Sequence, residues 1–134
     1  MTGGCQCGAV RYRIEGPPKA VTACHCRECQ RQSGSAFGMS LIVARDGFHL
    51  DQGDVQVYSR VGESGLEVAG AFCGICGTRL YHDLERNPTT RNVKAGTLDD
   101  PSECAPILHV WTDSRQRWFT LPEAVPHFGR NPGE

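Results

Sequence analysis

Apolar and polar residues alternate over short stretches of this chain, and a period of two is typical of half-buried β-strands. The first stretch runs from Gly8 to Glu15. Gly16-Pro17-Pro18 ends it, because proline lacks the donor of a strand ladder and glycine permits a turn. A second short strand is predicted from Ala20 to Cys24.

Later parts of the chain continue this pattern of short strands. The segment between Cys26 and Ser33 is compatible with one or two helical turns, which Gly34 ends. Glycine and proline number 24 of 134 residues, so long helices are not expected. The sequence therefore predicts a mainly β protein. Its further strands are expected at Ala36–Ala44, Phe48–Leu50, Val55–Ser59, Leu66–Phe72, Leu80–His82, Arg91–Ala95, Pro106–Trp111 and Arg117–Phe119.

The chain is long enough for one domain with a single core. We expect most of its large aromatic side chains to lie in that core, namely Tyr12, Phe37, Trp111, Trp118 and Phe119. The segment from Leu121 to Glu134 holds three prolines and two glycines. We expect it to wrap the surface or to fray.

Composition narrows the classes of function. A net charge of −1 and a pI near 6.5 give no electrostatic basis for binding nucleic acid or an anionic membrane. No apolar run reaches the length that spans a bilayer. The N-terminus, Met1 to Cys5, lacks the basic start and apolar stretch of a secretory signal. We therefore expect a cytoplasmic protein without nucleic-acid or membrane partners, and its oligomeric state is left open.

The cysteines carry the most specific signal in the chain. Seven of the eight lie in three tight clusters, and Cys104 stands alone. Cytosolic thiols are kept reduced, so paired cysteines at short spacing favour metal binding over disulfides. Thiolates are soft, strong ligands for zinc. The clusters are Cys5-Gln6-Cys7, Cys24-His25-Cys26-Arg27-Glu28-Cys29 and Cys73-Gly74-Ile75-Cys76.

The first and third clusters predict one closed zinc site. Residues i and i+2 of an extended segment face the same way, so Cys5 and Cys7 can point at one ion. Cys73 and Cys76 fit a zinc-knuckle turn, in which glycine lets backbone amides approach the sulfurs. Four thiolates complete a tetrahedron, which is the mark of a structural zinc.

Cys24, Cys26 and Cys29 then predict a second zinc with three protein ligands and one open position. An open position is typical of catalytic zinc. Three thiolates over-neutralise the dication, so zinc-bound water should be a poor acid, and a fourth sulfur suits the site better. This favours thiol chemistry over hydrolysis.

Two residues could close the central site instead. Cys104 could fold back to it, although a lone cysteine is more often a small buried apolar residue. His25 lies between two ligands and is expected to face away and to pack beside the site. Asp99 and Asp100 could supply a general base, but an Asp-rich turn before Pro101 is the more favoured interpretation.

With these residues in place, the chain resembles the glutathione-dependent formaldehyde-activating family, which includes the centromere-protein-V-like proteins. The resemblance spans about residues 3 to 126. It rests on the three cysteine clusters in order, on Ser33-Gly34 and Gly96-Thr97-Leu98-Asp99, and on Trp118 with Pro122.

The resemblance implies a zinc-braced β-tent, or Mss4-like, single domain of short antiparallel strands over residues 1–126, with a tail over 127–134. It implies a structural zinc at Cys5, Cys7, Cys73 and Cys76, a catalytic zinc at the central cluster, and thus two zinc ions per chain. The implied activity joins glutathione to formaldehyde as S-hydroxymethylglutathione, a carbon–sulfur lyase reaction run in reverse.

Our mechanistic hypothesis is that a thiol substrate ligates the central zinc as thiolate and attacks a small carbonyl. Arg27 or Arg31 could receive a carboxylate of a glutathione-like molecule, and Phe37 could wall its pocket. The electrophile is not fixed by the sequence. The alternative is a binding or interaction module with two structural zincs and no catalysis.

Overall fold

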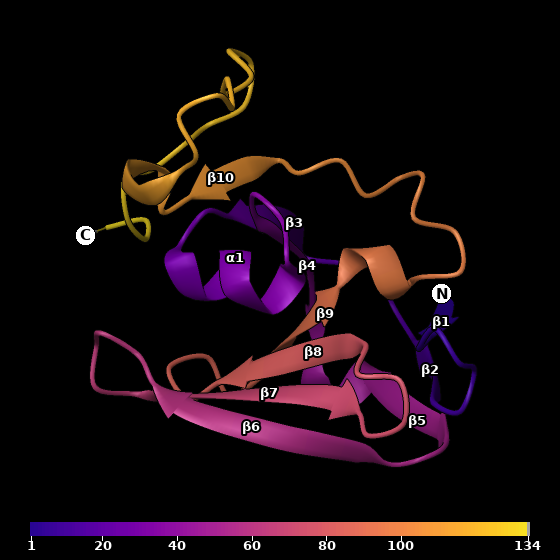
Figure 1. Ribbon diagram of the computed structural model, residues 1–134. Coiled ribbons are helices and arrows are strands. Elements are labelled where there is room, and N and C mark those ends of the chain that lie inside the picture. The colour runs from indigo at the N-terminus through magenta and orange to yellow at the C-terminus, as the bar shows by residue number, and fades with distance from the viewer. Residues whose placement is uncertain (134) are drawn as a thin grey trace.

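The computed structural model describes residues 1–133 and contains two β-sheets. One sheet has three strands in the order β1-β2-β5, and the other has seven in the order β10-β3-β4-β9-β8-β7-β6 (Figure 1). The strands are β1 (Thr2–Gly4), β2 (Arg11–Ile14), β3 (Ala20–Cys24), β4 (Gly38–Ala44), β5 (Phe48–Gln52), β6 (Val55–Val61), β7 (Glu67–Cys73), β8 (Arg79–Leu84), β9 (Thr90–Lys94) and β10 (Leu108–Val110). The helices are α1 (Arg27–Ser33) and the 3₁₀ turns η1 (Arg45–Gly47), η2 (Ala95–Thr97) and η3 (Thr112–Ser114).

The predicted mainly β, single-domain fold is confirmed, and every strand pair but one is antiparallel. The exception is β10, which pairs in parallel with β3. The strand from Ala20 to Cys24 has the predicted bounds. Gly34 ends α1 in the left-handed conformation at φ 61°, where its N–H caps the helix. No helix within residues 1–133 has the length and apolar character to cross a bilayer.

The predicted strand at Arg117–Phe119 is wrong, since this segment is a turn. Of the five aromatic residues expected in the core, only Tyr12 belongs to it. Trp118 is 71% exposed, and the other three, Phe37, Trp111 and Phe119, are half-buried outside it. A three-residue alternation is too short to specify a strand when a neighbouring strand is missing. The following segment is ordered by backbone pairing, with Phe128 N–H donating to His109 O and Thr112 N–H to Phe128 O. Glu134 lies outside the described residues.

The hydrophobic core lies between one face of the seven-stranded sheet and the three-stranded sheet. Strand register places Ala71, Tyr81 and Val93 in one row across β7, β8 and β9, and Leu41 of β4 continues it. These four side chains are buried. Phe48 of β5 packs edge-on against Tyr81 at 5.0 Å between ring centroids. The alternation of the sequence thus turns one side chain in two toward this core.

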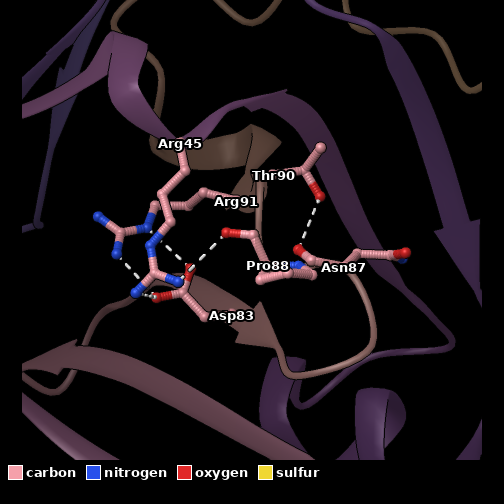
Figure 2. A network of polar contacts seen from close by, with 6 residues as sticks. All are labelled: Arg45, Asp83, Asn87, Pro88, Thr90 and Arg91. Carbon is pink, nitrogen blue, oxygen red and sulfur yellow. Dashed lines mark hydrogen bonds and ion pairs between the residues drawn. The ribbon is translucent and has the colours of Figure 1, made fainter.

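A charged network borders the core (Figure 2). The guanidinium of Arg91 donates two hydrogen bonds to the Asp83 carboxylate, at 2.8 and 2.7 Å, and Arg45 pairs with the same carboxylate at 3.1 Å. Arg91 also lies 3.9 Å above the Tyr81 ring. A bidentate pair between half-buried groups with a cation–π contact holds β8 against β9.

The other face of the seven-stranded sheet is polar, and we call it the polar face. Tyr58, Gly70, His82 and Asn92 lie opposite one another in successive strands, so these four positions share this face. Lys94 shares it, two residues after Asn92. In Figure 1, α1 lies on the upper side of strands β6, β7 and β8.

Candidate metal centres

Four cysteines from two distant turns come together as the first centre. Cys5 and Cys7 follow β1, Cys73 is the last residue of β7, and Cys76 lies in the turn after it. Their sulfurs all lie within 4.8 Å of one another, with 3.6 Å between Cys5 and Cys7 and 3.9 Å between Cys7 and Cys73. All eight cysteines of the chain are free thiols.

Backbone amides are aimed at these sulfurs. Val10 N–H donates to Cys5 Sγ at 3.2 Å, and Ile75 N–H donates to Cys73 Sγ at 3.4 Å. Hydrogen bonds from Thr78 lower the pKa of Cys76 to about 5. Such donors stabilise thiolate over thiol, which is the form that binds a metal.

Glycine allows both turns to form. Gly8 and Gly77 each follow a cysteine pair and each has φ 81°, a left-handed conformation that glycine adopts without steric cost. The two turns therefore fold back on their own sulfurs in the same way. Zinc–sulfur bonds of about 2.3 Å in a tetrahedron separate the sulfurs by about 3.8 Å. The donor set fits a closed zinc site.

The central cluster is built by the junction of β3 with α1. Cys24 ends β3, Cys26 is the N-cap of α1, and Cys29 lies in the first turn of that helix. Their sulfurs also lie within 4.8 Å of one another. Cys26 Sγ accepts a hydrogen bond from Cys29 N–H at 3.3 Å, so the cap that starts the helix also orients two of the three thiols.

A glycine on the neighbouring strand makes room for this cluster. Gly38 pairs with Cys24 across β3 and β4. A Cβ atom at Gly38 would lie 3.3 Å from the Cβ of Cys29 and 3.7 Å from its sulfur. The absence of a side chain at Gly38 therefore lets α1 approach this strand closely.

The three thiols share their charge unequally. Hydrogen bonds from Cys24 and Cys29 lower the pKa of Cys26 to about 2. The hydrogen bonds with Cys26 and Cys29 raise the pKa of Cys24 far above its ordinary value. Negative charge is therefore concentrated on Cys26, and a bound cation would be needed for all three sulfurs to ionise together.

No fourth histidine, cysteine, aspartate or glutamate among residues 1–133 joins the central cluster. Cys104 is buried in the hydrophobic core and belongs to neither cluster. His25 Nε2 is 2.8 Å from His109 Nδ1, and the His25 ring packs 5.1 Å from the rings of Phe37 and Phe119. His25 thus packs beside the site, as expected, and the donor set fits a zinc ion with one non-protein ligand.

The comparison with protein families gives a clear answer. The family described as glutathione-dependent formaldehyde-activating enzyme (GFA) matches residues 1–114 of this chain. The chain belongs to the GFA family.

Two individual proteins extend this comparison. A relative from Halomonas elongata, named "Putative glutathione-dependent formaldehyde-activating enzyme", is 24% identical over 126 residues, which cover 90% of this chain and 80% of the relative. A crystal structure of a Rhodobacter sphaeroides protein has 22% sequence identity and a TM-score of 0.59, over 74% of this chain and 88% of that one. This second likeness shows a shared fold.

In this member of the GFA family, the central cluster borders the polar face of the sheet. Thr22, Ser40 and Lys94 lie opposite one another in β3, β4 and β9, and Cys24 is two residues beyond Thr22. Cys24 therefore opens onto the same face as Lys94. Burial lowers the pKa of the Lys94 ammonium, and the charges of Cys29 and Cys24 oppose this effect.

Two arginines add to this cationic environment, and His82 lies beside them. Arg79 lies over Gly70, where a Cβ atom would be 3.0 Å from its guanidinium nitrogen. Arg60 is 3.9 Å from Glu28 of α1. Burial, followed by the charges of Lys94 and Arg60, lowers the pKa of His82 well below 6.5. His82 Nδ1 is buried without a hydrogen-bond partner.

Sequence reasoning missed this group of Lys94, Arg79, Arg60 and His82. Alternation within β9 separates Lys94 from the buried Val93, and that signal was present in the sequence. Which face of which strand meets α1 depends on the order β4-β9-β8-β7-β6, which joins segments distant in the chain. Local patterns do not contain that order.

The predicted substrate contacts lie elsewhere. Arg27 and Arg31 line a groove on the outside of α1, together with Trp118, and none of the three central cysteines lines it. Phe37 packs on His25 and does not line that groove. A substrate contact by any of these three residues stays a prediction.

Proposed function

We propose that this protein forms, or in reverse cleaves, a carbon–sulfur bond between a thiol and a small aldehyde, with zinc at Cys24, Cys26 and Cys29. Membership of the GFA family supports thiol and formaldehyde as the reacting classes. The observation that carries the proposal is the central cluster of three thiols, which no fourth ligand from residues 1–133 completes. This cluster borders the polar face, on which Lys94 and Arg79 lie.

The two centres have different roles in this proposal. Cys5, Cys7, Cys73 and Cys76 would hold a structural zinc that joins the first turn of the chain to the turn after β7. Cys24, Cys26 and Cys29 would hold the second zinc. When bound, that zinc supplies a Lewis acid that keeps a thiol substrate ionised at neutral pH.

Lys94 and Arg79 would stabilise the reacting thiolate. Three thiolates exceed the charge of one dication, and a substrate thiolate adds another negative charge. Positive side chains on the bordering face offset this excess where water is partly excluded. Glu28 would hold Arg60 near α1, which keeps that guanidinium on the polar face.

The reaction balances without a redox partner. The sulfur–carbon bond forms as the carbon–oxygen π bond opens, and the proton lost by the thiol ends on the new hydroxyl oxygen. The same residues serve the reverse direction, in which the hydroxymethyl thiol returns aldehyde and thiol. Lys94 and Arg79 favour a thiol that carries its own carboxylate, because an anionic substrate gains from both charges.

Exchange spectroscopy tests this proposal. The exchange rate between glutathione and its hydroxymethyl adduct is measured by NMR with and without zinc-loaded protein. We expect faster exchange with the wild type and with Cys104→Ser, and the uncatalysed rate with Cys26→Ser. Wild-type exchange at the uncatalysed rate would favour the alternative of a binding module with two structural zincs.

A further inference from the structure

A second groove lies on the outside of α1, apart from both cysteine clusters. Its volume is about 500 Å³, within the range of small-molecule sites, and it is broadly open to solvent. It is formed between α1, the turn after it and the segment after η3. Arg27, Gln30 and Arg31 of α1 line it together with Gln116 and Trp118.

Trp118 is exposed at this groove but held in place. Its indole Nε1–H donates to Gln116 Oε1 at 2.6 Å, and Gln116 Nε2 donates to Gln30 Oε1 at 3.3 Å. Gln30 is buried and donates in turn to the backbone oxygens of His25 and Ser114, at 2.8 and 3.0 Å. This chain of amides fixes the indole in advance, so a ligand that stacks on it would lose little entropy by ordering it.

The groove is cationic. Arg27 and Arg31 are four residues apart on α1 and therefore project from the same side of the helix. No carboxylate lines the groove, and neither arginine has an ion-pair partner within the described part of the chain. Arg27 donates a hydrogen bond to Gln30 Oε1, which fixes its direction.

We propose that this groove binds a ligand made of a flat ring and an anionic group, at a site distinct from the proposed thiol centre. The ring would stack on the indole of Trp118, and the anion would be bound by Arg27 and Arg31. A nucleoside monophosphate and an aromatic carboxylate share this chemistry. The proposal is independent of the proposed reaction, because no residue of the groove is a thiol.

The two tryptophans give a direct test. Indole N–H signals of ¹⁵N-labelled, zinc-loaded protein are followed by NMR, and Trp118→Phe assigns them. Trp111 serves as the internal reference, because its Nε1–H donates to Asn131 instead. The probes are adenosine monophosphate and benzoate, with adenosine and inorganic phosphate as their separate halves.

We expect adenosine monophosphate, benzoate or both to move the Trp118 signal saturably while Trp111 stays fixed. Adenosine and phosphate alone should bind at least about tenfold more weakly. The double variant Arg27→Gln/Arg31→Gln should weaken binding about tenfold. The matched double variant Lys19→Gln/Arg117→Gln removes the same charge outside the groove and should stay within about twofold.

Several results would overturn the proposal. One is a Trp118 signal that neither ring-bearing anion moves. Another is equal binding of phosphate alone, or equal weakening by the matched variant, since either would reduce the effect to general charge. Loss of binding in Lys94→Met would place the ligand at the thiol centre instead. A Trp118 signal that responds only to protein concentration would mean that a second copy covers the groove.

Discussion

The two metal centres should contribute differently to the free energy of unfolding, because they close loops of different length. In the first centre, Cys7 and Cys73 are 66 residues apart, whereas the whole central cluster lies within six residues. The chain-entropy relation for a covalent cross-link gives about 4 kcal/mol for the longer loop and about 2 kcal/mol for the shorter. A metal cross-link constrains the unfolded chain in the same way.

The perturbation removes two ligands from each centre in turn. Cys7→Ser/Cys76→Ser opens the first centre, and Cys24→Ser/Cys26→Ser opens the central one. None of these four cysteines is fully buried, so little packing is lost. Serine at position 26 can still act as N-cap of α1, which keeps the helix start intact. We expect losses of about 4 and about 2 kcal/mol in the free energy of unfolding.

The assay is urea unfolding at fixed free zinc, with the zinc content of each variant measured separately. A domain of this size is stabilised by about 5–15 kcal/mol, so the first variant should retain a measurable folded baseline. Cys104→Ser is the control, because it buries a hydroxyl in the core and should keep full zinc content. Equal losses from the two double variants, or a larger loss from the central one, would refute the loop-length reasoning.

Three further predictions concern single charged or titratable side chains. Lys94→Met should weaken binding of an anionic thiol about tenfold with unchanged zinc content, and Lys94→Arg should restore most of it, as measured by calorimetry. The pKa of His82 is lowered in the folded protein, so below about pH 6.5 His82 is protonated in the unfolded chain before it is protonated in the folded one. The contribution of His82 to the free energy of unfolding is therefore fully present above that pH and is lost as the pH falls. His82→Gln should flatten this fall by up to about 1.4 kcal/mol per pH unit in urea titrations. Arg91→Met should lower the free energy of unfolding by about 3 kcal/mol, because it removes the bidentate partner of the half-buried Asp83 carboxylate. Arg45→Met should lower it by under about 1 kcal/mol, because the Arg45 side chain is 47% exposed. Equal shifts of the melting temperature in the two variants would contradict this.

Local spacing made the ligand clusters and several elements predictable. Two cysteines at i and i+2, or in a CxxC turn, are brought together by the backbone of their own segment whatever the rest of the fold does. The strand ending at Cys24 and the short helix ended by Gly34 follow from equally local signals. Cys104 stands apart from the other cysteines in the sequence and was therefore expected to be a small buried residue. Its place in the hydrophobic core confirms this.

The polar face beside the central cluster could not be predicted in the same way. It joins Arg60, Arg79, His82 and Lys94, which reach one surface only through the order and register of β6 to β9. The outer groove has the same origin, since Trp118 reaches Arg27 through a segment without regular secondary structure. The error at Arg117–Phe119 arose because three alternating residues carry no signal for the missing partner strand.

The central claim is that Cys24, Cys26 and Cys29 hold a zinc ion that accepts a substrate sulfur as its fourth ligand. X-ray absorption at the zinc edge tests it most directly, on fully loaded protein before and after addition of glutathione. With one four-sulfur and one three-sulfur site, the mean should rise from about 3.5 to about 4 sulfurs per zinc. A mean of four before addition, or a mean that glutathione leaves unchanged, would contradict the account.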